Sequence, residues 1–297
     1  MKPRDLIDLL LLAALWGASF LFMRMAAPSF GPIALVEVRV SVAALMLLPL
    51  LAWQNGMREL RSRVGPIVLI GLLNSAIPFA LLSYGTLHLT AGFASILNAT
   101  TPMWTALVAW LWFHDKIRTW QSLGLVVGLV GVVVLVWGKA DIRPGSSGFA
   151  TFLAIGACLL ATLSYGVSAN LIKRRLTGVA PLTIATGSQC AAALALAPLA
   201  FYSWPAHPPG LRSWIAALLL GVMCTALAYI LYFRLLARIG PMGAASVTFL
   251  IPLFATLWGA MLLHEGLTAQ MAAGGTVILV GTVLVLGLVG GKRRQVS

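Results

Sequence analysis

The sequence predicts an all-α integral membrane protein with ten transmembrane helices. Its composition, its long apolar runs and an internal repeat carry this prediction. Of the 297 residues, 60% are hydrophobic and 9% are charged, and the mean hydropathy is +0.98. Soluble proteins are about 25% charged. So few charges cannot cover a water-facing surface, and lipid must therefore solvate most of this chain.

Ten apolar runs follow one another along the chain, separated by short connections that contain Pro, Gly or charged residues. A helix needs about 20 apolar residues to cross a bilayer. The predicted spans are 6–24, 32–53, 64–84, 90–113, 120–137, 148–172, 181–203, 212–236, 241–263 and 269–290. Runs of this length without two-residue alternation predict helices rather than barrel strands. The first run is too long for the apolar part of a signal peptide, and no small-residue cleavage site interrupts it.

The distribution of Lys and Arg predicts the orientation, because cytoplasmic connections carry an excess of both. One side holds Lys2, Arg4, Arg58, Arg61, Arg63, Lys116, Arg118, Lys173, Arg174, Arg175, Arg234, Arg238, Lys292, Arg293 and Arg294. The other side holds Arg24, Lys139, Arg143 and Arg212. We therefore expect both termini in the cytoplasm, in a membrane of the bacterial inner (plasma) type. The basic residues form no aromatic-rich face, which argues against nucleic acid as a partner.

The chain also matches itself at an offset of 149 or 150 residues. The matched residues are Trp16-Gly17 with Tyr165-Gly166, Ser19 with Ser168, Pro32 with Pro181, Pro49 with Pro198, Gly71 with Gly221, Pro102 with Pro252, His114-Asp115 with His264-Glu265, Gly124 with Gly274, and Gly131 with Gly281. These residue types are sparse, so their shared register indicates a duplication. Each copy would hold five spans, so the second copy enters the membrane from the opposite side. We expect inverted repeats over 1–143 and 144–297 around a central cavity, an arrangement typical of transporters.

The motifs resemble a known family. The segment Leu15-Trp16-Gly17-Ala18-Ser19-Phe20 is similar to the opening of EamA-type members of the drug/metabolite transporter superfamily. So are the run from Thr90 through Thr101-Pro102 to His114-Asp115 and the run from Gly240-Pro241 to His264-Glu265. The resemblance covers nearly the whole chain. It implies ten helices in two inverted halves, a central cavity, and export of amino acids or related metabolites. Within the family, the chain resembles the aromatic amino acid exporters in its general likeness and its interior rich in Trp and Tyr.

Polar side chains within the spans mark the expected site, because polar groups in hydrocarbon are costly unless they face protein or water. Ser95, Asn98, Thr101 and Thr105 recur at helical spacing, which predicts one polar face of the fourth span. Hydrogen bonding between helices is the alternative. The predicted substrate-binding residues are Trp16, Ser19, Asn74, Tyr84, Ser95, Asn98, Thr101, Trp104, Tyr165, Gln189, Tyr229 and Thr248. Pro102 and Pro252 predict helix kinks.

Glu37 and Arg39 are the charges inside a span. They are two residues apart, so they point to different faces of the helix. Arg39 could bind a substrate carboxylate, or it could serve a structural role against backbone carbonyls. Glu37 could exchange protons, or it could simply reach water. The remaining interior holds few acids, which favours transport without strong ion coupling.

The sequence therefore predicts a transporter that exports amino acids, with aromatic or hydrophobic ones favoured, by alternating access. A broad-specificity drug or metabolite efflux transporter, with proton coupling left open, is the alternative. The spans lack the clustered acids, His or Cys of an enzyme, so no catalytic residue, cofactor or metal is expected. The expected partners are the lipid bilayer and a small-molecule substrate. The oligomeric state stays open, and a monomer is compatible with the sequence.

Overall fold

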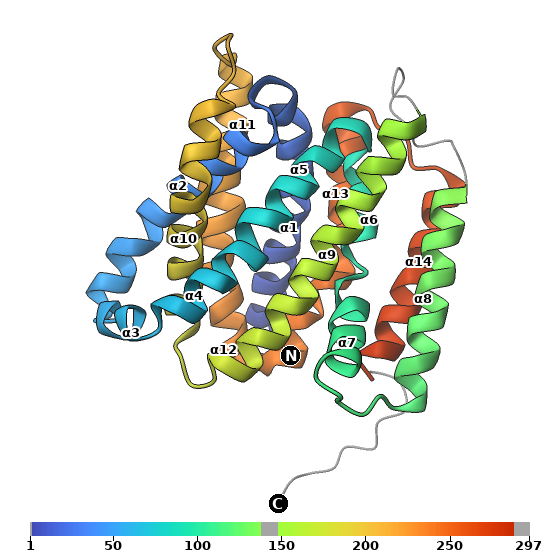
Figure 1. The fold of residues 1–297 in the computed structure, drawn as a ribbon. Coiled ribbons are helices and arrows are strands. Elements are labelled where there is room, and N and C mark those ends of the chain that lie inside the picture. Colours follow the sequence, from blue (N-terminus) through green and yellow to red (C-terminus); the bar gives the residue numbers. More distant parts are fainter. Residues whose placement is uncertain (1, 138–147, 288–297) are drawn as a thin grey trace, which may run out of the picture.

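The computed structural model describes residues 2–137 and 148–287, and its described elements are helices (Figure 1). Seven helical segments of this described part are long and apolar enough to cross a membrane. They are Pro3–Phe30 (α1), Pro32–Trp53 (α2), Val64–His88 (α4, η1 and α5), Thr119–Trp137 (α8), Gly148–Arg175 (α9), Pro181–Tyr202 (α10) and Leu211–Gly240 (α11, η3 and the first part of α12). Two shorter apolar helices, Val247–Leu263 (α13) and Ala269–Val285 (α14), follow. The chain is therefore a helical membrane protein, as the composition predicts.

The span expected over 90–113 is not one continuous helix. It consists of α6 (Ala91–Asn98) and α7 (Thr101–Leu111). Pro102 lies in the first turn of α7, where its missing N–H costs no hydrogen bond. The predicted kink is thus a break immediately before Pro102, whereas Pro252 lies inside the uninterrupted helix α13. A short surface helix, α3 (Met57–Ser62), joins α2 to α4 and was not expected.

Two π-helical turns interrupt the third and eighth predicted spans. The first, η1 (Leu72–Ala76), lies between α4 (Val64–Gly71) and α5 (Ile77–His88). The second, η3 (Val222–Leu227), lies between α11 (Leu211–Gly221) and α12 (Ala228–Ala245), and α12 is kinked at Gly240. Such wide turns are rare and recur at functional sites.

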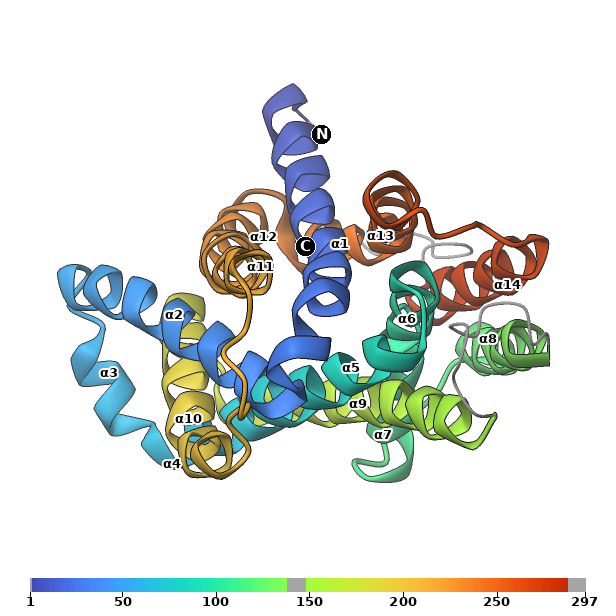
Figure 2. The ribbon, with the colours of Figure 1, turned by 90° about the horizontal axis from the view of Figure 1, so that it is seen from above.

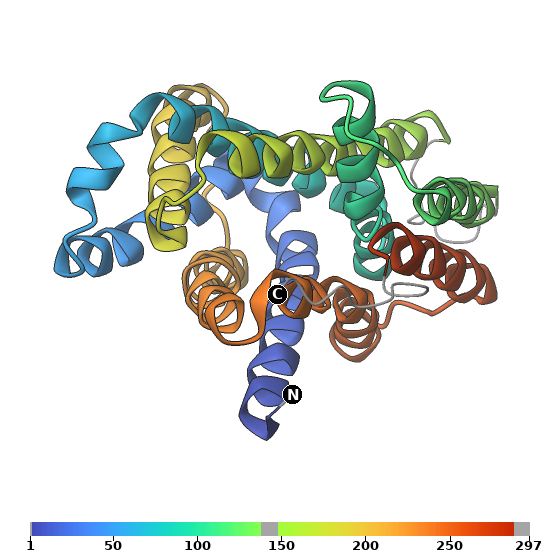
Figure 3. The ribbon, with the colours of Figure 1, turned by 90° about the horizontal axis from the view of Figure 1, so that it is seen from below.

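Helices distant in the sequence pack side by side (Figures 1 and 2). Helix α1 starts at the lower face of the bundle in Figure 1 and ends at the upper face. The pairs in contact are α1 with α13, α2 with α10, α5 with α9, and α8 with α14. Seen from below, α8 and α14 stand together at one side, and α2, α3 and α10 lie at the other (Figure 3). Each pair joins a helix from the first part of the chain to one from the second.

Some predicted features fall outside the described residues. These are the boundary at 143 and 144, the cations Lys139, Arg143, Lys292, Arg293 and Arg294, and the last residues of the tenth predicted span. The division of the chain at that boundary stays a prediction.

Glycines hold α8 and α14 in close contact. A Cβ on Gly281 would lie 2.5 Å from the backbone nitrogen of Gly128, and one on Gly124 would lie 2.7 Å from the carbonyl oxygen of Gly281. Gln121 Nε2 donates to the carbonyl of Val285, 3.2 Å away, and Gln270 Nε2 donates to that of Val134, 2.7 Å away. Small residues let helix backbones approach in lipid, where dispersion replaces the hydrophobic drive for association. The pair is therefore held by backbone contact and two amide hydrogen bonds.

We predict that Gly281→Leu destabilises the protein, because its side chain would collide with the backbone of α8. Overpacking of this kind costs about 1–3 kcal/mol. The measurement is the apparent melting temperature of the purified protein in detergent. Gly156→Leu is the matched control, since a Cβ at Gly156 meets nothing within 4 Å. Equal melting temperatures for the two variants would contradict the close packing.

Candidate functional site

Two glycine crossings bring the third and eighth spans close to α10 and α2. A Cβ on Gly71 would lie 2.7 Å from the Cβ of Ala191 and 2.8 Å from the carbonyl oxygen of Ser188. A Cβ on Gly221 would lie 2.7 Å from the Cβ of Val42 and 3.0 Å from the carbonyl oxygen of Arg39. No side chain fits at either glycine, so each crossing is a backbone contact. Each crossing stands immediately before a π-helical turn.

Each π-helical turn carries a hydroxyl group that receives a hydrogen bond at its crossing. Gln189 Nε2 donates to Ser75 Oγ at 2.9 Å, and Arg39 Nε donates to Thr225 Oγ1 at 2.9 Å. All four residues are buried. Ser75 and Thr225 were not among the residues predicted from the sequence. The internal repeat could have identified them, because an offset of 150 residues pairs Ser75 with Thr225.

The groups at the two crossings extend into one polar cluster inside the apolar bundle. Asn74 Nδ2 donates to the Tyr229 hydroxyl at 3.5 Å. Tyr229 also interacts with Ser75 and, electrostatically, with Arg39. We call the following residues the central polar cluster: Arg39, Asn74, Ser75, Gln189, Thr225 and Tyr229. Of the predicted site residues, the structure thus brings together Arg39, Asn74, Gln189 and Tyr229.

Aromatic and soft apolar groups surround this cluster. The Cζ atom of Arg39 lies 3.6 Å from the centre of the Phe79 ring, which the sequence analysis did not select. Arg39 also interacts electrostatically with Tyr165 of α9. Trp16 of α1 and Tyr232 of α12 have ring centres 5.5 Å apart. Ser164 Oγ donates to the carbonyl of Leu73 at 2.7 Å and so provides a partner for a carbonyl in the π-helical turn.

The polar residues of the fourth predicted span behave differently from one another. Ser95 is buried and donates to the carbonyl of Gly92, while Thr101 and Thr105 donate to carbonyls in their own turns. Asn98 keeps a buried side-chain oxygen without a hydrogen-bond partner. Because the span breaks after Asn98, these residues do not form the continuous helical face that the spacing predicted.

Trp104 lies against α9, since a Cβ on Gly166 would lie 3.1 Å from the Trp104 Cβ. Gly166 directly follows Tyr165, so Trp104 borders the helix that supplies Tyr165. The equivalent crossing at Gly17 would place a Cβ 2.7 Å from the Cβ of Phe254. Both aromatic residues are half-buried.

The remaining predicted residues lie at other places. Tyr84 contacts His88 on its own helix, with ring centres 5.4 Å apart. Thr248 is half-buried in the first turn of α13. Ser19 is buried on α1 and interacts with Cys224, the residue before Thr225. Glu37 accepts a hydrogen bond from Ser41 at 2.7 Å, and its other carboxylate oxygen is buried without a partner.

Ion pairs join the helices at the two faces of the bundle. At the upper face, Arg24 Nε lies 2.9 Å from Glu265 Oε1, and their side chains are 14% and 9% exposed. At the lower face, Arg174 Nη2 lies 2.7 Å from Asp115 Oδ1, with exposures of 39% and 41%. At an offset of 150 residues, Asp115 matches Glu265 and Arg24 matches Arg174. Glu265 is further held by the backbone N–H of Ala91, at 2.8 Å.

A second set of charges joins α1 and α12 at the lower face. Arg238 pairs with Asp5 at 3.3 Å and hydrogen-bonds to Asp8, while Arg234 lies 3.9 Å from Asp8. At the upper face, α5 and α9 instead meet through Gly85 and the buried Cys158. Helices α1 and α12 are therefore joined by charges at this face in addition to the apolar cluster that contains Leu9, Leu12, Leu231 and Leu235, whereas α5 and α9 meet at the other face through Gly85 and Cys158.

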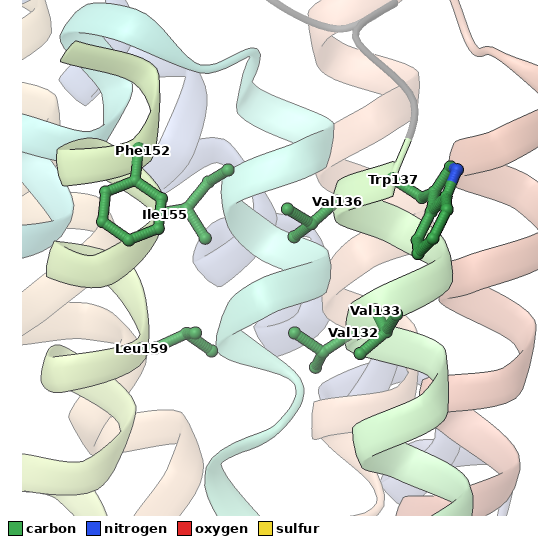
Figure 4. Close-up of a pocket in the computed structure, with 7 residues that line it drawn as sticks. All are labelled: Val132, Val133, Val136, Trp137, Phe152, Ile155 and Leu159. Carbon is green, nitrogen blue, oxygen red and sulfur yellow. The ribbon is translucent and has the colours of Figure 1, made fainter. Parts of the chain in front are cut away.

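A pocket of about 300 Å³ lies between α8 and α9 (Figure 4). It is lined by Val132, Val133, Val136, Trp137, Phe152, Ile155 and Leu159. Phe152 is 69% exposed and Trp137 is 83% exposed, so the pocket opens on the outer surface of the bundle. This apolar pocket is separate from the central polar cluster.

Comparison with known proteins decides the family. The model of the EamA-like transporter family matches residues 6–137 and 152–287. The chain belongs to this family, within the drug/metabolite transporter superfamily. EamA-like proteins of this kind are transporters and not enzymes.

Curated relatives of this EamA-like protein match it over most of both lengths. The "Uncharacterized inner membrane transporter YedA" of Escherichia coli is 26% identical and covers 97% of this chain and 94% of its own. A "Probable terminal-alkyne amino-acid exporter" of Streptantibioticus cattleyicolor is 23% identical over 97% of this chain and 95% of its own. A solved crystal structure superposes with a TM-score of 0.65 at 17% identity and covers 97% of this chain and 98% of its own, which supports the fold alone.

Proposed function

We propose that this EamA-like transporter exports amino acids with aromatic or hydrophobic side chains across the inner membrane, by alternating access and without strong ion coupling. The observation that carries the proposal is the central polar cluster, with Trp16, Phe79, Tyr165 and Tyr232 around it. These groups can offer hydrogen bonds to a polar head group and aromatic surface to an apolar side chain. The exporter from Streptantibioticus cattleyicolor, named for an amino-acid substrate, agrees with this class.

We also propose that the chain forms ten transmembrane helices in two inverted halves around a central cavity, divided near residue 143. The π-helical turns, the glycine crossings and the acids of the facial ion pairs recur at offsets of 149 or 150 residues. The family model also matches on both sides of the proposed boundary. Counting α6 with α7 as one span makes ten.

The ion pairs at the two faces support alternating access. Each pair joins a helix of one proposed half to a loop of the other, so separation of the halves at one face would break the pair there. Arg24–Glu265 is the more buried pair, and its acid has an additional backbone donor. The upper face would then be the periplasmic one, because α1 starts at the lower face and we place the N-terminus in the cytoplasm. We infer that the protein rests with its periplasmic face closed.

The transport proposal predicts uptake of labelled L-phenylalanine into proteoliposomes down its concentration gradient. Asn98→Ala and Trp104→Ala should lower the initial rate by roughly tenfold, since one lost hydrogen bond or aromatic contact amounts to about 1–1.5 kcal/mol. Both variants should keep the gel-filtration profile of the wild type. Tyr202→Ala is the control, because Tyr202 is 87% exposed at the end of α10.

Uptake that requires an imposed proton or sodium gradient would contradict the uncoupled mechanism. The absence of uptake for every aromatic and aliphatic amino acid would refute the proposed substrate. Unchanged rates in both variants would remove Asn98 and Trp104 from the site.

The closed periplasmic face can be tested with a native cysteine. Cys224 is buried beside Arg39 in the central region, and Cys158 and Cys190 can be replaced by alanine. We predict that Glu265→Gln raises the rate at which a membrane-impermeant maleimide labels Cys224 from the periplasmic side. A partly buried ion pair is worth about 1 kcal/mol, which corresponds to roughly a fivefold shift between the open and closed states.

Asp115→Asn is the matched control, because it removes the acid of the other ion pair at the opposite face. It should not raise periplasmic labelling, because it weakens the closure of the other face. Equal labelling of the wild type and Glu265→Gln would show that the Arg24–Glu265 pair does not keep this face closed.

A further inference from the structure

We propose that Arg39 is the carboxylate-binding residue of the transporter, so that its substrates must carry an anionic head group. This inference rests on the proposed function and specifies the chemistry of the same site. It assigns to one buried guanidinium the recognition that separates amino acids from neutral or cationic compounds of similar shape.

In the described part of the chain, Arg39 has no acidic residue to balance its charge. Arg39 is 5% exposed at the middle of α2. Among the residues that the structure describes, no Asp or Glu forms an ion pair with it, and Glu37 of the same helix bonds to Ser41 instead. A buried charge without a partner costs several kcal/mol by rough estimates. A buried positive charge of this kind attracts an anion, because the anion supplies the missing counter-charge.

The contacts of the Arg39 guanidinium orient it and leave its two terminal nitrogens available. Its Nε donates to Thr225 Oγ1, and the Phe79 ring covers one face of its plane at 3.6 Å. Its Nη1 reaches only the sulfur of Met23, at 3.9 Å, and in the described part of the chain neither Nη atom donates to an oxygen. Thr225 and Phe79 thus fix the orientation of the group. The two terminal nitrogens remain available, and they form the edge that a carboxylate binds through two parallel hydrogen bonds.

The groups near Arg39 can accept a hydrogen bond from an ammonium group and contact an apolar side chain. Gln189 joins the same cluster through Ser75, and its side-chain oxygen is buried without a hydrogen-bond partner. This oxygen can accept from an ammonium group. The cluster therefore offers a cationic donor for a carboxylate and a neutral acceptor for an amine, beside the aromatic rings of Phe79 and Tyr165. That combination fits a zwitterionic amino acid with an apolar side chain.

A structural role for Arg39 makes a different prediction from a binding role. A guanidinium that stabilised the fold would leave Thr225 and Phe79 without their partner when removed, and the melting temperature of the empty protein would fall. A buried guanidinium that serves to bind an anion instead lowers the stability of the protein when no substrate is bound. Replacement by an apolar residue of similar length should then leave the melting temperature unchanged or raise it.

The experiment measures binding of L-phenylalanine and L-phenylalaninamide to the purified full-length protein by calorimetry and by thermal shift. The amide keeps the ring and the ammonium group and replaces the carboxylate by a neutral group. We expect L-phenylalanine to bind at least tenfold more tightly than the amide. In Arg39→Met this preference should disappear, while the melting temperature without ligand stays at or above that of the wild type.

Arg39→Lys should keep part of the preference, because it retains the charge but loses the two-pronged edge. Arg212→Met is the matched control, since Arg212 is exposed at the start of α11 and should leave the preference intact. If Arg39→Met does not fold, the affinities of the wild type for L-phenylalanine and for the amide still test whether the protein recognises a carboxylate.

Equal affinity for acid and amide in the wild type would overturn the proposal, and so would a preserved preference in Arg39→Met. Proteoliposome uptake separates this failure from failure of the proposed function. Uptake of the amide at the rate of L-phenylalanine would refute the carboxylate site and leave amino acid-like transport standing. Uptake of neither compound would refute both.

Discussion

The distance between backbones at Gly71 and Gly221 is the constraint on which the interior of this transporter depends. At both glycines a Cβ would meet another helix at 2.7 Å, so a larger residue would separate α4 from α10 or α11 from α2. The hydrogen bonds of Ser75 and Thr225, four residues further along, require the same close approach. In lipid there is no hydrophobic force to compensate for a loose contact between helices. Two small residues therefore set the geometry of the central polar cluster.

The π-helical turns after these glycines explain how polar groups come to face the interior. A wide turn adds a residue to the helix and shifts the face on which the following side chains lie. It also leaves carbonyls in need of partners, which Ser164 supplies to Leu73 and Thr225 supplies to Leu220. The two turns match in sequence at an offset of 150 residues, but their partners differ in charge, since one is Gln189 and the other is Arg39. That difference makes the cluster asymmetric, as recognition of a molecule with two unlike ends requires.

The sequence predicted the helices well where apolar length and proline act locally. Helix α2 starts at Pro32 and ends at Trp53, as expected, and α10 starts at Pro181. The sequence did not predict the π-helical turns, because one extra residue in a long, mainly apolar run barely alters its hydropathy. The break after Asn98 was predicted only as a kink at Pro102, because proline indicates an interruption of the helix but not its extent. The partner of Arg39 is 186 residues away, so only the packing of α2 against η3 reveals it. Local patterns define the elements, and contacts between helices far apart in the sequence define the site.

The two faces of the bundle differ for a reason already present in the covalent structure. Glu265 at the upper face accepts from Arg24 and from the backbone N–H of Ala91, which lies in the first turn of α6. At an offset of 150 residues, the position that matches Ala91 is Pro241, and proline has no N–H to offer Asp115. Asp115 also lacks the methylene that lengthens Glu265. The Arg24–Glu265 pair therefore has a second donor and is more buried, whereas the Arg174–Asp115 pair is exposed to water. In the alternating access that we propose, such small differences give the transporter a preferred resting state, because only a difference in free energy between its two faces can populate one of them over the other.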